Sequence, residues 1–287
     1  MVNWKKYIGS GIMYAFLVAV TAPVVLLYAL LFITSFSTNV VGIIPQGLTL
    51  KFWKIVLSGE IKVPGAGGYY YYPNLYLVMG NTFLLAITVA VAEVILSSLA
   101  GYALSRFKFR GRPQLLGLIL VLHSFPGVAL LIALFYILNV LGLYDTLVGV
   151  IIIKIALDLP LDVWIMKGFF DGIPWDLEMS ALIDGCNRVQ TWWKVLLPTV
   201  RNGLMAVLIF GFLSGWSEFI YILTFISSQK YWTLSMLIYA LKSSEYMYVS
   251  PALTAAAAII YMIPVIIFFL FAQKYLLRIQ IAAKGVV

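Results

Sequence analysis

The chain has 287 residues, of which 63% are hydrophobic and 10% are charged. A soluble domain of this length carries about a quarter charged residues, so the composition excludes an ordinary soluble domain and indicates a membrane protein. The formal net charge is +8, but Lys and Arg lie beside apolar runs, which is typical of membrane orientation signals and not of a nucleic-acid surface. We therefore expect membrane lipid and no nucleic acid among the partners.

Cysteine and histidine are too few to build disulfides or typical zinc sites. Cys186 is the single cysteine and His123 the single histidine of the chain, which excludes an intrachain disulfide and leaves a zinc site without enough ligands. We interpret His123 as a packed or pore-facing polar residue, and we predict no metal site.

Apolar runs of spanning length predict an all-α membrane protein with six transmembrane helices. A span needs about 20 apolar residues, and a helix satisfies its own backbone in lipid. The first run follows a short basic start and is too long for the apolar region of a signal peptide, so we expect a retained helix. The runs lie at about 12–36, 82–104, 115–138, 146–166, 203–225 and 252–274.

The distribution of Lys and Arg orients these helices. With the amino terminus inside, most of the 19 Lys and Arg fall in inner segments, which is a positive-inside bias. Both termini and the segment at about 167–202 then face the cytoplasm, which predicts a multi-pass protein of the cytoplasmic membrane. We expect residues 1–80 to form a first helix with a long extracytoplasmic loop, and 81–287 to hold the other five helices.

Two long outer segments join the predicted helices. The first, at about 37–80, contains PGAGGYYYYPN, whose Gly and Pro predict irregular structure. Its tyrosines either form a contact surface for another protein or lie at the membrane interface, where aromatic residues are common. The second, at about 226–251, is amphipathic, and we expect it to fold back over the helices.

Residues 178–198, EMSALIDGCNRVQTWWKVLLP, form a polar segment between two apolar runs. Pro174 can begin a helix here, acidic side chains follow in its first turn, and Gly185 is a typical stop. A second short helical turn runs through 189–196. This amphipathic pair of helices either lies on the lipid surface or docks into a groove of a soluble partner. The apolar stripe of the first helix consists of Trp175, Met179, Leu182 and Ile183.

The spacing of this segment resembles the cytoplasmic EAA loop of ABC importer permeases. That pattern is Glu-Ala-Ala, three residues, Gly, nine residues, an apolar residue, one more, then Leu-Pro. Here Met179-Ser180-Ala181 occupy the Glu-Ala-Ala positions, Gly185 follows, and Val195 precedes Leu197-Pro198. Met179 replaces the motif glutamate and Glu178 lies one position earlier, which leaves open whether an ion pair of that glutamate is kept.

The resemblance extends over about residues 80–287, to the MalG-like, carbohydrate-uptake branch of these permeases. It implies a transport subunit rather than an enzyme, and a chain that binds no cofactor itself. The segments that carry it are GYALSRFKFRGR, LNVLGLYDTLVGVII, LPLDVWIMKGFFDGIPWDLE, GWSEFIYILTF and AAAAIIYMIPVIIFFLFAQKYLL.

The resemblance also implies the partners. A second permease subunit would complete a heterodimer, two ATPase subunits would use ATP and Mg on the cytoplasmic side, and an extracytoplasmic substrate-binding protein would deliver a sugar or oligosaccharide. ATPase closure would push on a docked coupling helix and switch the permease by alternating access. This chain has no G-x-x-x-x-G-K-[ST] phosphate loop. The implied docking residues are Trp175, Glu178, Met179, Ser180, Ala181, Ile183, Asp184, Gly185, Leu197 and Pro198.

Charged residues within the predicted spans should face protein or water, because a charge at mid-membrane costs about 2.5–3.5 kcal/mol on insertion scales. Lys154 and Asp158 lie one turn apart, and we interpret them as a self-neutralising pair. Asp162 follows near the cytoplasmic end, where we expect it to be solvated. Other polar and aromatic residues either line a solute path or are structural. These are Glu218, Trp216, Tyr221, Glu93, Asn81 and Asn139.

Two alternatives to a sugar importer remain open at this point. The EAA spacing is shared by ABC permeases for non-sugar solutes. A secondary transporter or channel that works without ATP is the alternative from another class, and paired broken helices in two halves would favour it.

Overall fold

The structure is a computed structural model that describes residues 4–65, 68–243 and 249–284. It divides into two compact units, Met1–Leu75 with Ile238–Ile263, and Tyr76–Leu237 with Pro264–Val287. The chain passes between the units at the start of α3 and within α12 (Leu234–Ser243) and α13 (Pro251–Lys284). The predicted boundary at residue 80 lies close to the first of these crossings, whereas the return of 238–263 has no signal in the sequence.

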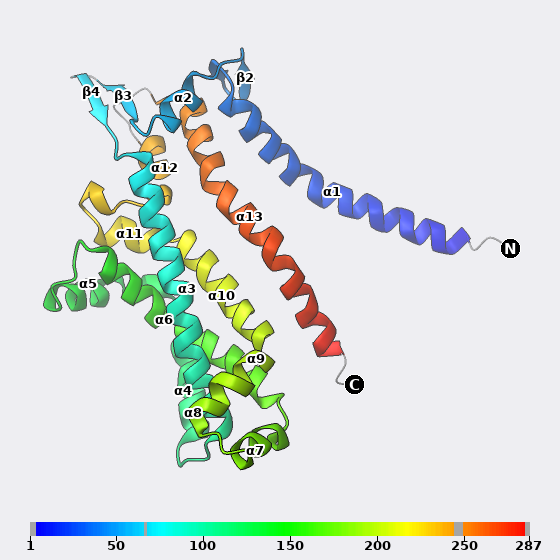
Figure 1. Cartoon of the computed structure of the whole chain (residues 1–287). Coiled ribbons are helices and arrows are strands. Elements are labelled where there is room, and N and C mark those ends of the chain that lie inside the picture. Colours follow the sequence, from blue (N-terminus) through cyan, green and yellow to red (C-terminus); the bar gives the residue numbers. More distant parts are fainter. Residues whose placement is uncertain (1–3, 66–67, 244–248, 285–287) are drawn as a thin grey trace. The chain divides into compact units, whose positions relative to one another are not determined.

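The first unit combines one long apolar helix with two small hairpins (Figure 1). Both hairpins are antiparallel, with Val40 opposite Pro45 in one and Val63 opposite Tyr70 in the other. The Trp53 ring stacks on Phe36 with ring centroids 5.4 Å apart. Its elements are α1 (Trp4–Ser35), β1 (Asn39–Val41), β2 (Ile44–Gln46), α2 (Lys51–Leu57), β3 (Lys62–Gly65) and β4 (Gly68–Tyr71).

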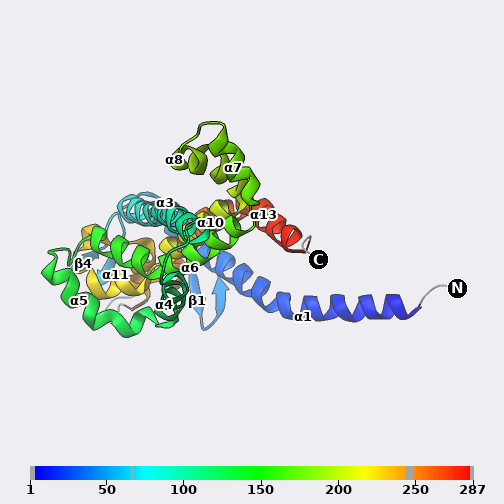
Figure 2. The ribbon, with the colours of Figure 1, turned by 90° about the horizontal axis from the view of Figure 1, so that it is seen from below.

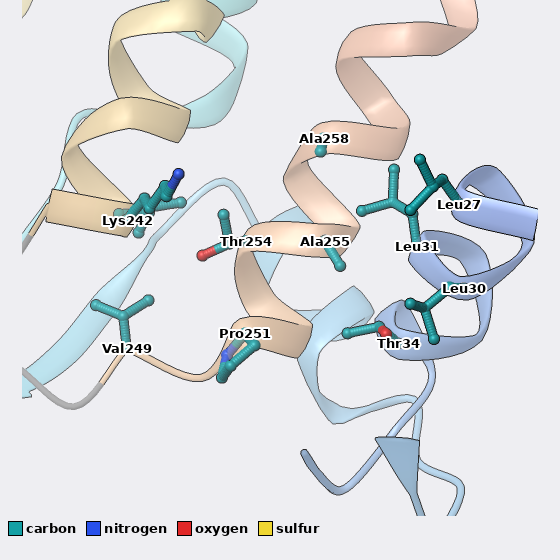
Figure 3. A pocket seen from close by; sticks show the side chains of 11 residues that line it. Leu27, Leu30, Leu31, Thr34, Lys242, Val249, Pro251, Thr254, Ala255 and Ala258 are labelled. Atoms are coloured by element: carbon teal, nitrogen blue, oxygen red, sulfur yellow. The ribbon is translucent and has the colours of Figure 1, made fainter. Parts of the chain in front are cut away.

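Helix α1 leaves most of its apolar surface uncovered by the rest of this unit. Within its apolar stretch Met13–Ser35, none of the 18 residues of the most hydrophobic part is buried. A pocket of about 450 Å³ separates its Leu27 and Leu31 side chains from Ala255 and Ala258 of α13 (Figure 3). Because exposed leucine-rich surface is unfavourable in water, lipid or another protein has to cover this helix.

The second unit is a helical bundle built around α3, α6 and α10, which run side by side (Figures 1 and 2). Small residues allow this close approach: a Cβ added at Gly215 of α10 would lie 2.8 Å from the Ala86 Cα of α3. Its elements are α3 (Leu75–Arg106), α4 (Arg112–Ser124), η1 (Gly127–Leu130), α5 (Leu131–Val140), α6 (Leu147–Asp171), α7 (Trp175–Ile183), α8 (Arg188–Thr191), η2 (Trp192–Leu196), α9 (Leu197–Thr199), α10 (Arg201–Trp216), α11 (Ile220–Phe225) and η3 (Gln229–Tyr231).

Helices lie at all six predicted positions, but two of the predicted spans are broken. Within the described residues, Met13–Ser35, Leu75–Arg106 and Pro251–Gln273 are long and apolar enough to cross a membrane. Two bent pairs raise the number to five if each is one span: Arg112–Ser124 with Gly127–Val140, bent by 88°, and Arg188–Thr199 with Arg201–Trp216, bent by 80° ahead of the predicted span 203–225. Helix α6 carries Lys154, Asp158 and Asp162 at the fourth predicted position. The count of six crossings therefore stays a prediction.

The breaks have local causes. The predicted span 115–138 bends between α4 and η1, where Pro126 has no N–H to continue the helix. A Cβ at the neighbouring Gly127 would lie 2.1 Å from the Tyr221 hydroxyl, so the chain passes close to α11 here. The predicted span 203–225 ends early at Trp216, and α11 starts afresh where the Glu218 carboxylate accepts a hydrogen bond from the Tyr221 amide at 2.8 Å.

Candidate functional site

The segment between α6 and α10 begins with α7, which starts directly after Pro174. Asp176 and Glu178 lie in its first turn, where carboxylates stabilise the positive end of a helix. The start of the helix is therefore confirmed at the residue that the sequence indicated.

Gly185 ends this helix, as predicted. Its φ of +89° is a left-handed conformation that favours glycine. The amides of Gly185 and Cys186 donate to the carbonyls of Leu182 and Ala181 at 3.2 and 3.1 Å, which satisfies the end of the helix. The chain can therefore reverse sharply into α8.

The second part of the segment begins with a capped helix and continues in a wider, π-helical turn. The Asn187 side chain accepts a hydrogen bond from the Gln190 amide at 2.8 Å, and the Gln190 side chain accepts one from the Asn187 amide at 2.9 Å. This reciprocal capping box fixes the start of α8. A π-helical turn, η2, and the short α9 then lead into α10. The second helical turn predicted at 189–196 is thus present as α8 followed by η2.

Helix α7 buries an acidic residue and exposes apolar ones. Glu178 is fully buried and Ala181 is 7% exposed, whereas Ile183 is 85% exposed. The predicted apolar stripe is therefore not a buried face, since its ends, Trp175 and Ile183, lie open. We define the α7–α8 patch as the exposed apolar side chains of α7, α8 and the adjoining η2, namely Trp175, Leu177, Ile183, Val189 and Trp193.

The other predicted docking residues lie around this patch. They share one connected segment at one end of the second unit (Figure 1). Exposed members are Ser180, Asp184, Gly185 and Pro198, and partly buried members are Met179 and Leu197.

The Glu178 carboxylate ties α7 to α3. Its Oε2 lies 3.0 Å from Nε of Arg106, and this pair is 3% and 0% exposed. Its Oε1 accepts a hydrogen bond from the Tyr102 hydroxyl at 3.0 Å and lies 3.4 Å from Arg188, which is half exposed. Glu178, the residue before Met179, therefore makes ion pairs within this chain; whether they replace a pair of the motif glutamate stays a prediction.

Arg106 also holds the chain at the entrance to α7. Its guanidinium donates to the Ile173 carbonyl at 2.9 Å and lies 5.1 Å from the centre of the Trp175 ring. Tyr102, Ile173 and Leu196 belong to one buried cluster with side chains of α6 and α10. The segment that carries the α7–α8 patch is thus held to the bundle by Arg106 and by this buried cluster. The sequence did not predict that Tyr102, Arg106 and Arg188 contact Glu178. Tyr102 and Arg106 lie in the GYALSRFKFRGR segment and Arg188 lies in the 178–198 segment, and only their aromatic or basic type pointed to such a contact.

A second group of charged residues lies inside the bundle. Lys154 is 3.2 Å from Asp158 and 3.4 Å from Glu218, so the predicted Lys154–Asp158 pair is confirmed and gains a second carboxylate. Asp158 also accepts a hydrogen bond from the Ser214 hydroxyl at 2.6 Å. Asp162 is 3% exposed, so the expectation that it is solvated is wrong, because α3 and α10 cover that side of α6.

The remaining pathway candidates occupy different environments. Trp216 is 2% exposed and stacks on Phe212 at 5.7 Å, and Tyr221 is 8% exposed. The Asn81 amide donates to the carbonyls of Lys230 and Trp232 at 2.8 and 2.9 Å, which is a structural tie. Asn139 is exposed, and its amide donates to the Phe135 carbonyl of its own helix at 2.8 Å. Glu93 is fully buried in α3.

No group of three or more His, Cys, Asp or Glu side chains in the described parts of the chain could hold a metal ion.

Comparison with known proteins identifies the family. The family of binding-protein-dependent transport system inner membrane components matches residues 93–279. The chain therefore belongs to this family of ABC transporter permeases, as the sequence predicted, and it is a multi-pass transport subunit, not an enzyme.

The names of its relatives give different transported solutes. The chain is 34% identical over 200 residues to the sulfoquinovosyl glycerol transport system permease protein SmoH of Agrobacterium fabrum, covering 70% of each chain. It is 32% identical over 194 residues to the trehalose transport system permease protein SugB of Mycobacterium tuberculosis, covering 68% of this chain and 71% of that one.

Solved structures share the fold. A bacterial ABC transporter involved in the import of the acidic polysaccharide alginate superposes with a TM-score of 0.78 at 21% identity, covering 96% of this chain and 98% of that one.

Proposed function

We propose that this chain is one permease subunit of an ATP-driven, binding-protein-dependent importer for a sugar or oligosaccharide. A second permease subunit, two ATPase subunits that use ATP and Mg, and an extracytoplasmic binding protein complete the assembly. Both termini and the α7–α8 patch face the cytoplasm. The names of the relatives support a sugar, since both of those given above transport carbohydrate derivatives.

The observation that carries the proposal is the α7–α8 patch itself. Large apolar side chains of the patch are strongly exposed, Ile183 at 85% and Trp193 at 64%, which is typical of a surface that a partner covers. Its inner side is held to the bundle by the buried Glu178–Arg106 pair. A force applied to the patch would therefore move α3 with it and would not simply deform a flexible loop.

Docking to a soluble ATPase is favoured over simple contact with lipid. An interfacial lipid-binding helix presents one long apolar face, whereas α7 has nine residues and ends at a sharp glycine reversal. Two short helices at an angle make a compact, shaped surface, which suits a groove on a partner.

Replacing Ile183 with Asp tests this function. In proteoliposomes that contain the complete importer, we expect Ile183→Asp to lower ATP-dependent sugar uptake at least about tenfold, because a charge at the centre of a desolvated contact is a hot-spot loss. Ile183 makes no buried contact that the substitution would break, so the amount of protein in the membrane should not change. Ala181 is a less suitable test position, because it is 7% exposed and a charge there would disturb α7 itself.

The matched control is Ile43→Asp. Ile43 is 78% exposed in the predicted extracytoplasmic loop, so the same change there should leave uptake unaltered. Normal uptake by Ile183→Asp, with its ATPase bound, would refute the docking function. Uptake by the wild type without any ATPase would favour a secondary transporter instead.

A further inference from the structure

An apolar groove of about 540 Å³ lies in the second unit, where α3, η2, α9 and α10 meet, near the label of α9 in Figure 1. Its volume equals that of about 18 liquid waters. A methylene group takes up about as much space as a water molecule, so the groove has room for one lipid acyl chain. The lining side chains that carry the argument are Val94, Ile95, Trp192, Leu204 and Arg201.

The α3 wall of the groove belongs to a membrane-spanning helix. Val94 and Ile95 line the groove, and they lie within Leu75–Arg106, which is long and apolar enough to cross a membrane. Ile95 is 50% exposed. Since the chain is a multi-pass membrane protein, lipid or another membrane-embedded segment has to cover this wall.

Arg201 lies at the end of the groove that is nearest the carboxyl end of α3. A Cβ added at Gly215 would lie 2.8 Å from the Ala86 Cα, and one added at Gly211 would lie 2.9 Å from the Ala90 Cα. Helix α10 therefore runs antiparallel to α3. Because Arg201 is the first residue of α10, its guanidinium lies toward the end of the span that the proposed function places on the cytoplasmic side.

The charges of this region are positive and unbalanced. Between positions 185 and 217 the charged residues are Arg188, Lys194 and Arg201, all of them basic. Arg188 lies 3.4 Å from the Glu178 carboxylate. Lys194 and Arg201 are exposed, and neither has an ion-pair partner among the described residues. A basic groove between membrane helices on the cytoplasmic side is typical of a site for an anionic lipid headgroup.

The Trp192 side chain adds a donor to this groove. Its indole N–H is buried and has no acceptor within the described parts of the chain, which is unfavourable for a polar group. Phosphate and ester oxygens of a glycerophospholipid are acceptors, and Trp is common at the level of lipid headgroups. Trp192 also packs against the buried cluster that contains Leu196, so an occupant of the groove would contact the segment that carries the α7–α8 patch.

Other occupants match these features less well. An apolar helix of a second permease subunit would cover the α3 wall but leave the Arg201 and Trp192 donors without acceptors. A soluble ATPase can reach Trp193, which belongs to both the patch and the groove, but Ile95 lies in a membrane-spanning helix. A zwitterionic lipid brings an ammonium group of its own, which the charges of Arg201 and Lys194 disfavour.

We propose that this groove binds one anionic glycerophospholipid of the cytoplasmic leaflet, with an acyl chain along Ile95 and Leu204 and the phosphate at Arg201. Lys194 adds to the positive charge of the same segment. The lipid site goes beyond the importer function, and only its assignment to the cytoplasmic leaflet rests on that function.

The test uses the complex that is purified from native membranes through this chain and placed in nanodiscs of phosphatidylcholine. A trace lipid carries a photo-reactive diazirine in its acyl chain and has either a phosphatidylglycerol or a phosphatidylethanolamine headgroup. Mass spectrometry then measures the label on residues 192–204. We expect phosphatidylglycerol to label them about tenfold more strongly than phosphatidylethanolamine, because it forms a hydrogen bond between charged groups without bringing a cation.

Two pairs of variants locate the headgroup and the acyl chain. Arg201→Gln should reduce labelling by phosphatidylglycerol to the level of phosphatidylethanolamine. Its control is Arg110→Gln, because Arg110 is also exposed and lies outside the groove, and this variant should keep the preference. Ile95→Trp fills the groove from α3 and should lower the labelling about tenfold. Leu96→Trp, at a neighbouring position that is 43% exposed and outside the groove, should not.

Equal labelling by the two lipids, an unchanged preference in Arg201→Gln, or unchanged labelling in Ile95→Trp would overturn the lipid site. A photo-reactive amino acid at position 95 that captures a second permease subunit and no lipid would also overturn it. Labelling needs no ATP, sugar or binding protein, so a complex that fails to transport sugar can still be tested. The predicted labelling in such a complex would support the lipid site while refuting the importer function.

Discussion

Breaking the Arg106–Glu178 ion pair should detach α7 from α3 and loosen the α7–α8 patch. The two charges are 3.0 Å apart with exposures of 3% and 0%, so removal of either partner leaves the other buried without its nearest counter-charge. For such pairs the loss is about 3–5 kcal/mol. Arg106→Met should therefore destabilise the segment strongly, and Glu178→Leu should do so to a similar extent.

The other two partners of Glu178 should matter less, in a defined order. Tyr102 donates a buried hydrogen bond to the carboxylate at 3.0 Å, so Tyr102→Phe should cost about 1.5–3 kcal/mol, as for bonds to charged groups. Arg188 lies 3.4 Å away and is 50% exposed, so Arg188→Ala should cost about 0–1 kcal/mol.

Hydrogen exchange of residues 175–199 in the assembled importer measures this local stability. The double variant Arg106→Met with Glu178→Leu should recover part of the loss, because two apolar side chains replace the pair and no charge is left alone. The reasoning would be refuted if Arg188→Ala loosened the segment as much as Arg106→Met. It would also fail if the double variant were as unstable as the sum of the single ones.

Two further predictions concern packing and pH. In thermal unfolding, Gly211→Ala should lower the free energy of unfolding of the second unit by about 1–3 kcal/mol. The added Cβ would lie 2.9 Å from the Ala90 Cα, so the site would be overpacked. Gly168→Ala is the control and should not destabilise, because no atom apart from its chain neighbours and its own helix backbone lies within 4 Å of its Cβ. Asp145 accepts hydrogen bonds from the Ser227 and Ser228 amides at 2.8 and 2.9 Å. Burial raises the pKa of the Asp145 carboxyl, but the bonds from the Ser228 hydroxyl and the two amides outweigh it and lower the pKa below its usual value. The stabilisation is therefore complete above the ordinary carboxyl pKa of about 3.9 and is lost as pH falls through the lowered one. The hydrogen-exchange protection factors of the Ser227 and Ser228 amides should fall in that acid range for the wild type. For Asp145→Asn they should not depend on pH in this range. Identical pH profiles for the two proteins would contradict a stabilising role of the Asp145 carboxylate.

Local features of the segment were predictable from the sequence. The start after Pro174 and the stop at Gly185 depend on backbone properties of single residues, a proline φ and a glycine at φ +89°. The spacing from Met179 through Gly185 to Leu197-Pro198 predicted the family, because it depends on the short helices and the turn of this one segment. The break at Pro126 also carried a local signal, although the apolar run around it predicted a continuous helix.

Long-range features were not predictable in this way. Glu178 is buried although it is charged, because Tyr102, 76 positions earlier, and Arg106 meet it there. Asp162 was expected to be solvated because the sequence indicated its position near the cytoplasmic end of the helix. The sequence did not indicate that α3 and α10 cover this side chain. The helix breaks after Trp216, and the Glu218 carboxylate then accepts the Tyr221 amide at the start of α11. From the sequence alone, a glutamate that caps a new helix cannot be told from a glutamate within a continuous transmembrane helix.

Photo-crosslinking from position 183 tests the central claim most directly. A photo-reactive amino acid replaces Ile183 in the importer in native membranes, and the same amino acid replaces Ile43 in a parallel sample. Mass spectrometry then identifies the cross-linked protein. We expect a P-loop ATPase to be captured from position 183 and none from position 43. Cross-links from position 183 to lipid alone, or an ATPase captured equally from position 43, would contradict it.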